Sequence, residues 1–302
     1  VLKRLHESNN AEDGLSLLGG IWRFYQSQGQ LLELELWLDR FFALADPSVP
    51  SIGLTRGLMA RGALRYWQRD LGLAGNDYRL AVETARQFDD ELLLAEALYG
   101  LSSSLVVSGD DQEAKPLMEE ARAIYERRGD KGGVADIIAG EAFATLAVGG
   151  LIGLGPALTE ARDLYAAAGR SINAVQTRYA IAGVAIAEGR LGDARNSARE
   201  GVEAATSLND PFLTVWGLEY LALIDIETGL RDRGAKIVGA CQTARVSIGG
   251  GWGPDILGLK DGKETLEDMI GVDQAEAMIS PGRTLSIFDA VRLALGTDPS
   301  EP

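Results

Sequence analysis

The sequence is short of the side chains on which most metal and catalytic sites depend. Its 302 residues include one cysteine, Cys241, and one histidine, His6. A single cysteine cannot close an internal disulfide, which favours a reducing, cytoplasmic compartment. One histidine and one cysteine cannot form a zinc site, and a Ser-His-Asp triad would have to rely on His6 alone. We therefore expect no catalytic residue, no metal and no cofactor, and a protein that is not an enzyme.

Long apolar runs, proline and positive charge are also scarce. The most apolar stretch, 212–226, carries Glu219 and Asp225, so no membrane-spanning segment is expected. Nine prolines leave room for long helices. With 29 basic and 44 acidic residues the net charge is −15, which repels phosphate backbones and disfavours direct binding of nucleic acid. The chain begins at Val1 without a signal-peptide pattern, and we expect it to be a fragment of a longer protein.

What the chain does contain is a repeat with a step of 40 residues. Glycines mark one column of positions, broken once by an arginine: Gly29, Arg69, Gly109, Gly149, Gly189 and Gly229. A second column holds small residues from the second hairpin onward: Ala81, Ala121, Ala161, Gly201 and Cys241. Bulky residues recur between them, except that Arg178 stands in an apolar column. Small residues once per helix let neighbouring helices approach, and stacked hairpins bury a continuous core.

The spacing predicts an all-α solenoid of about six helical hairpins. In the third hairpin one helix is expected over 91–108, a turn at 109–111 and a second helix over 112–128. The repeats are assigned to a domain over 1–247, and a C-terminal helical cap with a disordered tail at 297–302 to a domain over 248–302. Within the cap, the glycine-rich break at 249–254 precedes helices near 261–270, 272–279 and 286–295.

The third hairpin, AEALYGLSSSLVVSGDDQEAKPLMEEARAIYERRGD, resembles the tetratricopeptide (TPR) consensus. The residues that match its large and small positions are Leu98, Leu101, Ser102, Gly109, Ala114 and Ala121. The longer period of 40 is similar to the sensor solenoids of bacterial STAND-type signal-transduction ATPases, which include LuxR-type regulators and relatives linked to adenylate cyclases. The segments IWRFYQSQGQLLELELWLDRFFALA, RGAKIVGACQTARVSIG and PGRTLSIFDAVRLALG resemble their opening and closing parts. This resemblance implies a sensing arm attached to an upstream ATPase module.

Two glycine-containing segments come close to nucleotide-binding loops. Segment 258–264 has one residue too few for a P-loop and ends in Glu264, so we interpret it as a loop that leads into a helix. Segment 149–155 falls on the predicted turn of the fourth hairpin and lacks the preceding strand of a dinucleotide fold. Cys241 lies in the small-residue column, where buried packing is expected rather than a reactive thiol.

The candidate binding surface is the concave face formed by the first helix of each hairpin. The residues predicted to form this face are Arg56, Tyr66, Trp67, Tyr99, Ser103, Phe143, Gln176, Tyr179 and Trp216. Further residues placed there by the repeat register are Met59, Ala63, Glu96, Asp136 and Glu219. Aromatic side chains with a polar rim often mark binding sites, although aromatics at helical spacing are more often core. Both interpretations stay open from the sequence.

Two functions follow from this surface. The first is a non-catalytic sensor or regulatory arm that binds a protein, a peptide or a small effector and controls an attached ATPase or transcriptional regulator. The second is a free-standing TPR scaffold that binds peptide segments of partner proteins. Scaffolds that clamp a terminal carboxylate use several cations, and the register places only Arg56 on the face, which argues against that variant.

Overall fold

The computed structural model describes residues 1–147, 153–248 and 253–296, and all of its elements are helices. After a short helix, α1 (Leu2–Glu7), the first helices of the hairpins, called A helices here, are α2 (Ala11–Ser27), α4 (Ile52–Trp67), α6 (Glu91–Ser108), α8 (Lys131–Ala147), α10 (Ser171–Ala187) and α12 (Pro211–Glu227). The second helices, called B helices, are α3 (Leu31–Phe42), α5 (Leu71–Ala85), α7 (Asp111–Arg128), α9 (Gly155–Ala167), α11 (Leu191–Ser207) and α13 (Arg231–Ile248). The predicted all-α architecture of six hairpins is confirmed, and α1 is an addition that the repeat pattern did not predict.

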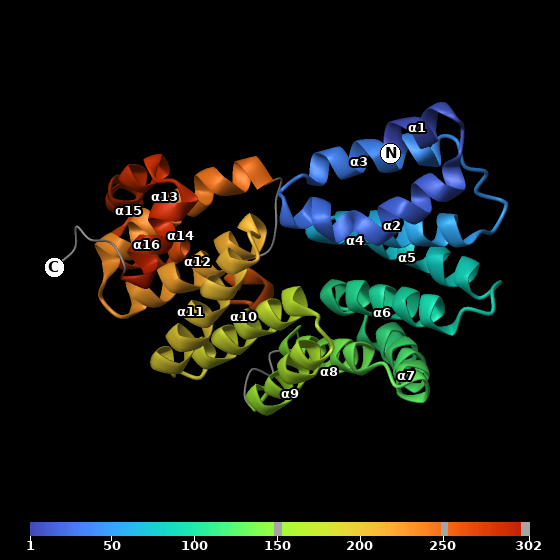
Figure 1. Ribbon diagram of the computed structural model, residues 1–302. Helices are drawn as coiled ribbons and strands as arrows, with labels where there is room; N and C mark the ends of the chain where they lie inside the picture. The colour runs from blue at the N-terminus through green and yellow to red at the C-terminus, as the bar shows by residue number, and fades with distance from the viewer. Residues whose placement is uncertain (148–152, 249–252, 297–302) are drawn as a thin grey trace. The chain divides into compact units, whose positions relative to one another are not determined.

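The chain divides into two compact units, unit 1 over Val1–Ala144 and unit 2 over Thr145–Pro302. In unit 1, α2 packs on α3 and α4, and each helix from α4 to α7 packs on the next one. In unit 2, the same succession runs from α9 to α13. Figure 1 shows these helices side by side within each unit, coloured in chain order. The predicted division into 1–247 and 248–302 remains a prediction.

The turns follow the 40-residue step in conformation as well as in composition. Gly29, Gly109, Gly189 and Gly229 have φ values between 66° and 90°, in the left-handed region that ends a helix. Arg69, the residue that breaks the glycine column, has φ 67°. The second hairpin therefore keeps the turn geometry without a glycine, although a residue with a side chain is sterically strained in this region. Gly149, the remaining member of the column, lies outside the described residues.

Side-chain caps fix where several helices begin. The N-cap residues Asn10, Ser51, Asp70, Asp90 and Asp210 each accept a hydrogen bond from the backbone N–H three residues further on. These bonds satisfy donors that the first turn of a helix leaves without partners. Pro211 follows Asp210 at the first position of α12, where the missing N–H costs nothing.

The small-residue column lies at helix interfaces, as predicted. Ala81, Ala121 and Ala161 are completely buried. A Cβ atom added at Gly201, the next member, would overlap the ring of Tyr179, so the absent side chain makes room for that ring. These helices pack closely because a small residue on one helix faces a large side chain on its neighbour.

Two buried carboxylates are each held by a pair of arginines. Asp77 is 2% exposed and lies 2.7 Å from Arg61 and 2.6 Å from Arg65. In unit 2, Asp225 is completely buried between Arg195, at 2.5 Å, and Arg233, at 2.6 Å. A buried carboxylate survives without destabilising the fold only when such partners replace its lost hydration.

The C-terminal segment covers the last hairpin of unit 2. It comprises η1 (Pro254–Leu257), α14 (Gly262–Ile270), α15 (Val272–Ile279), η2 (Ser280–Thr284) and α16 (Ile287–Leu295). α14 packs on α12 and α13, α15 and η2 pack on α13, and α16 packs on both α12 and α13. Capping boxes at Asp261 and Ser286 start α14 and α16. The predicted helical cap is confirmed, while the glycine-rich break at 249–252 and the tail at 297–302 lie outside the described residues.

One described helix, α6, is long and apolar enough to cross a membrane by length and composition alone. Half of its residues are buried inside the fold, and it packs on α5, α7 and α4. The stretch expected to be the most apolar, 212–226, lies in a different helix, α12. Burial of this kind is what the central helix of a hairpin repeat requires, because each A helix contacts neighbours on both sides.

Candidate binding surface

The predicted surface residues fall on A helices of both units. Arg56, Tyr66 and Trp67 lie on α4, Tyr99 and Ser103 on α6, Gln176 and Tyr179 on α10, and Trp216 on α12. Phe143 belongs to α8, but its side chain lies outside the described residues.

In unit 2 the aromatic residues belong to the core. Tyr179 is completely buried, and Trp216 is 3% exposed. The Tyr179 hydroxyl donates to the Leu213 carbonyl at 2.9 Å, and its ring contacts Trp216 and stacks on Tyr220. Gly201 and Gly217 form two walls of the slot that holds this ring. Of the two interpretations left open by the sequence, the packing one therefore describes Tyr179 and Trp216.

In unit 1 the aromatic residues are closer to the surface. Tyr66 and Tyr99 are partly exposed, whereas Trp67 is buried against Tyr66. Arg56, the cation predicted for this face, is exposed and donates to the Ser16 hydroxyl at 3.2 Å. Asp136, on α8, is 6% exposed.

Sequence reasoning missed Arg23, on α2. Nitrogen Nη1 of its guanidinium is buried and has no hydrogen-bond partner among the described residues, while the group stacks over the Trp22 ring at 4.5 Å. Gln26, one helical turn further on, also has a buried amide nitrogen without a partner among those residues. The signal was available in the sequence, because Arg23 lies 40 residues before Ala63 and thus in the column of Ala63, Ser103 and Phe143.

The phenols of Tyr78 and Tyr99 lie within the electrostatic reach of Arg23, and the phenol of Tyr66 interacts with both of them. The pKa values of Tyr66, Tyr78 and Tyr99 are all raised above 10, mainly because burial disfavours the phenolate. The charge of Arg23 is close enough to oppose this shift in the pKa of both Tyr78 and Tyr99. Asp136 raises the pKa of Tyr99 further, and the Ser103 hydroxyl lowers it. We call the group formed by Arg23, Tyr66, Tyr78, Tyr99 and Asp136 the Arg23 site.

The Arg23 site suits recognition of an acceptor oxygen. A buried donor without a partner destabilises a protein by about 1–3 kcal/mol, and by more when it is charged, so a ligand that supplies an acceptor recovers that free energy. The phenols offer apolar rings and hydroxyl groups that lose little conformational entropy on binding. Asp136 adds a negative potential nearby, so a ligand carboxylate would be repelled, and a neutral carbonyl is the acceptor that fits.

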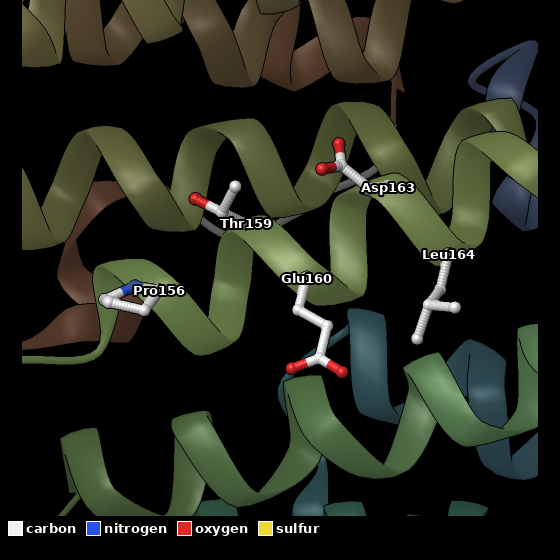
Figure 2. A pocket seen from close by; sticks show the side chains of 5 residues that line it. All are labelled: Pro156, Thr159, Glu160, Asp163 and Leu164. Carbon is white, nitrogen blue, oxygen red and sulfur yellow. The ribbon is translucent and has the colours of Figure 1, made fainter.

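A shallow depression of about 710 Å³ follows one face of α9, in unit 2. Figure 2 shows that its five labelled side chains, Pro156, Thr159, Glu160, Asp163 and Leu164, all arise from this one helix. Glu160 and Leu164 point in the same direction, as residues four apart on a helix do. None of the residues predicted for the binding surface lines it. Two exposed acids without convergent partners give this depression no specific chemistry.

Other predicted features take structural roles. The segment that resembles a P-loop provides the capping box of α14, and Lys263 forms an ion pair with Glu267 at 2.6 Å. Cys241 is buried, which raises the pKa of its thiol well above the ordinary value. Within residues 1–147, 153–248 and 253–296, no three histidine, cysteine, aspartate or glutamate side chains form a group that could hold a metal ion.

Comparison with known proteins identifies the fold. No protein-family model matches the sequence, and no curated protein matches it. Among solved structures, a Rap protein in complex with competence and sporulation factor is similar over 97% of this chain and 85% of its own, with a TM-score of 0.61 and 14% sequence identity. Aspartyl phosphate phosphatase F from Bacillus subtilis is similar over 94% of this chain and 73% of its own, with a TM-score of 0.59 and 8% identity. The chain is thus an all-α, TPR-like helical repeat protein of the α-solenoid class.

Proposed function

We propose that this chain is a non-catalytic, TPR-like scaffold that binds a segment of a partner protein at the Arg23 site. The observation that carries the proposal is the buried Arg23 guanidinium nitrogen, which has no partner among the described residues and lies near the phenols of Tyr78 and Tyr99. A backbone carbonyl of a partner segment would accept from Arg23 without the repulsion that Asp136 imposes on a carboxylate.

The similarity to solved structures supports the general class of this function. One similar solved structure is a Rap protein in complex with competence and sporulation factor, so a chain of this architecture can hold a ligand. The sequence identity of 14% carries the fold only, and the ligand of that protein is not transferred to this chain. Net charge supports the choice of partner, because −15 disfavours nucleic acid.

The experiment that tests this function is binding to an array of random peptides with amidated C-termini, followed by anisotropy measurements on those that bind. Arg23→Ala removes a hydrogen bond from a charged donor, which is worth about 1.5–3 kcal/mol and so corresponds to a loss of affinity of about 10- to 100-fold. Arg128→Ala is the matched control, because it removes the same charge from an exposed residue at the end of α7 in the same unit and should change affinity less than about twofold.

Two results would count against the proposal. Equal losses with Arg23→Ala and Arg128→Ala would show a general effect of charge. The second result combines two findings: no peptide in the array binds, and small uncharged amides from a library stabilise the wild type, but not Arg23→Ala, against heat. The site would then bind a small effector instead of a protein segment. Circular dichroism of both variants establishes that each keeps the helical fold.

The regulatory arm of a larger signalling protein is the second candidate. It is supported by the resemblance of the repeat period and of the segments at both ends to STAND-type solenoids, and it places a P-loop ATPase module upstream in the parent chain. Cytoplasmic location and the domain limits 1–247 and 248–302 belong to the same proposal. Determination of the flanking coding sequence tests it, and a parent chain without such a module would refute it.

Absence of catalysis is also part of the proposal. One structural neighbour carries the name of a phosphatase, so hydrolysis of an aspartyl phosphate is the catalytic alternative. The probe is a phosphorylated receiver domain of a response regulator. We expect it to lose its phosphate at the same rate with and without this chain. Acceleration that scales with the concentration of this chain would overturn the non-catalytic assignment.

A further inference from the structure

The A-helix face of unit 2 differs from that of unit 1 because the chain itself lies on it. The short helix η1 contacts both α10 and α12. Leu257, the last residue of η1, is 4% exposed, although it belongs to a segment of one 3-10 turn. A leucine buried by so short a segment must have a receptor on the helices beneath it.

That receptor is formed by Gly183 and Tyr220. A Cβ atom added at Gly183 would overlap Cδ1 of Leu257, and it would lie 3.3 Å from the Tyr220 hydroxyl. Gly183 is in the repeat column of Arg23, Ala63, Ser103 and Phe143, and it is the one member of this column without a side chain. The missing side chain opens a pocket of the size of one aliphatic group at this position of the repeat.

Charge fixes the other end of η1. Asp255 accepts a hydrogen bond from the Gly253 N–H at 3.1 Å, and it raises the pKa of both Glu219 and Arg245, which shows that it lies near their ion pair. Glu219 and Arg245 join at 2.7 Å, and a Cβ atom at Gly253 would lie 2.9 Å from Glu219. An acid near Arg245 and an aliphatic residue two positions later in the Gly183 pocket are thus the two anchors of this segment.

Pro254 and Leu257 are buried, yet η1 makes less contact with the helices than any other described element of the C-terminal segment. Its one backbone bond outside the 3-10 turn pattern closes the turn itself, from the Gly258 N–H to the Asp255 carbonyl at 3.0 Å. By contrast, α14, α15 and α16 each pack on α12, α13 or both. Segments with few buried contacts open at a small fraction of the global free energy of unfolding.

We propose that the A-helix face of unit 2 is a second binding groove, for a partner segment in which an aspartate precedes a leucine by two residues, and that Pro254–Leu257 occupies it as an internal competitor. The groove is independent of the Arg23 site. A partner segment enters when η1 leaves, and its affinity is reduced by the fraction of time for which η1 holds the pocket.

The test uses a fluorescein-labelled synthetic peptide, GPDILGLK, which copies residues 253–260. Leu257→Asp removes the aliphatic anchor of the internal segment and leaves the receptor intact. If η1 occupies the groove for at least about nine-tenths of the time, the peptide should bind this variant about tenfold or more tightly than the wild type, as measured by anisotropy. Leu230→Asp, which changes an exposed leucine of the same unit, is the matched control and should bind like the wild type.

A second variant addresses the pocket itself. In the Leu257→Asp background, Gly183→Leu fills the pocket with the receptor's own side chain, so peptide binding should return to the level of the wild type or below it. Equal peptide affinity in the wild type and in Leu257→Asp would overturn the proposal, as would binding that persists with Gly183→Leu. Loss of helical circular dichroism in Leu257→Asp would also overturn it, because η1 would then be a structural part of unit 2 rather than a competitor.

Discussion

Replacement of Tyr179 by alanine should destabilise unit 2 far more than a change at a partly exposed tyrosine destabilises unit 1. Tyr179 is completely buried, and its hydroxyl bond to Leu213 is 2.9 Å long. Truncation of a buried aromatic residue to alanine costs about 3–5 kcal/mol. Two walls of the cavity would be Gly201 and Gly217, which have no side chains that could move in, so the upper part of that range is expected.

Urea unfolding followed by far-ultraviolet circular dichroism measures this effect. Tyr179→Phe keeps the ring and loses only the hydrogen bond, so it should cost about 0.5–1.5 kcal/mol. Tyr99→Ala, in unit 1, removes a ring that is partly exposed and should cost less than Tyr179→Ala. An unfolding midpoint of Tyr179→Ala equal to that of the wild type would refute the assignment of Tyr179 to the core and reopen its role as a surface residue.

Three further predictions follow from packing and charge. Asp225→Ala leaves Arg195 and Arg233 without their shared carboxylate and should lower the free energy of unfolding by about 3–5 kcal/mol. Glu113→Ala, which removes an exposed pair with Arg79, should lower it by about 1 kcal/mol or less. Similar urea midpoints for the two variants would contradict the value for Asp225→Ala. Ala121→Trp should lower the free energy of unfolding by about 1–3 kcal/mol, because the buried position has no room for the larger side chain. Ala123→Trp, on the exposed side of α7, should not lower it. Equal melting temperatures for the two variants would show that Ala121 does not lie at a helix interface. Burial raises the pKa of Tyr66, Tyr78, Tyr99, Tyr179 and Tyr220 above 10. Their contribution to stability is therefore complete below pH 10 and is lost as the pH rises further, because the unfolded chain then ionises first. Absorbance of tyrosinate from these residues near pH 10, with the helices still intact, would contradict this prediction.

The repeat architecture could be predicted because its signals are local and periodic. Turn glycines recur in every hairpin except the second, and a small residue recurs in every hairpin from the second onward. Both properties are set by the backbone and by helix contacts. The two exceptions did not matter, since Arg69 adopts the same left-handed conformation as the glycines, and Arg178 pairs with Glu200 while its carbonyl accepts from Ser197 at 2.9 Å.

The candidate site was harder to predict because the repeat register shows on which face of a helix a residue lies but not how deeply its side chain is buried. Tyr179 and Trp216 share a face with Tyr99 in the repeat, yet Tyr179 sinks into a slot that Gly201 and Gly217 open on other helices. Such compensation depends on residues far apart in sequence. Arg23 could have been found by extension of the Ala63 column, whereas the occupation of the Gly183 pocket by Leu257 required coordinates.

The Arg23 site is tested most directly by a crystal structure of the chain with the peptide that binds best from the array. The account predicts a backbone carbonyl oxygen of that peptide within about 2.7–3.2 Å of Nη1 of Arg23, with the rings of Tyr66 and Tyr99 against the peptide. A peptide bound elsewhere on the chain, with Arg23 still lacking an acceptor, would contradict it.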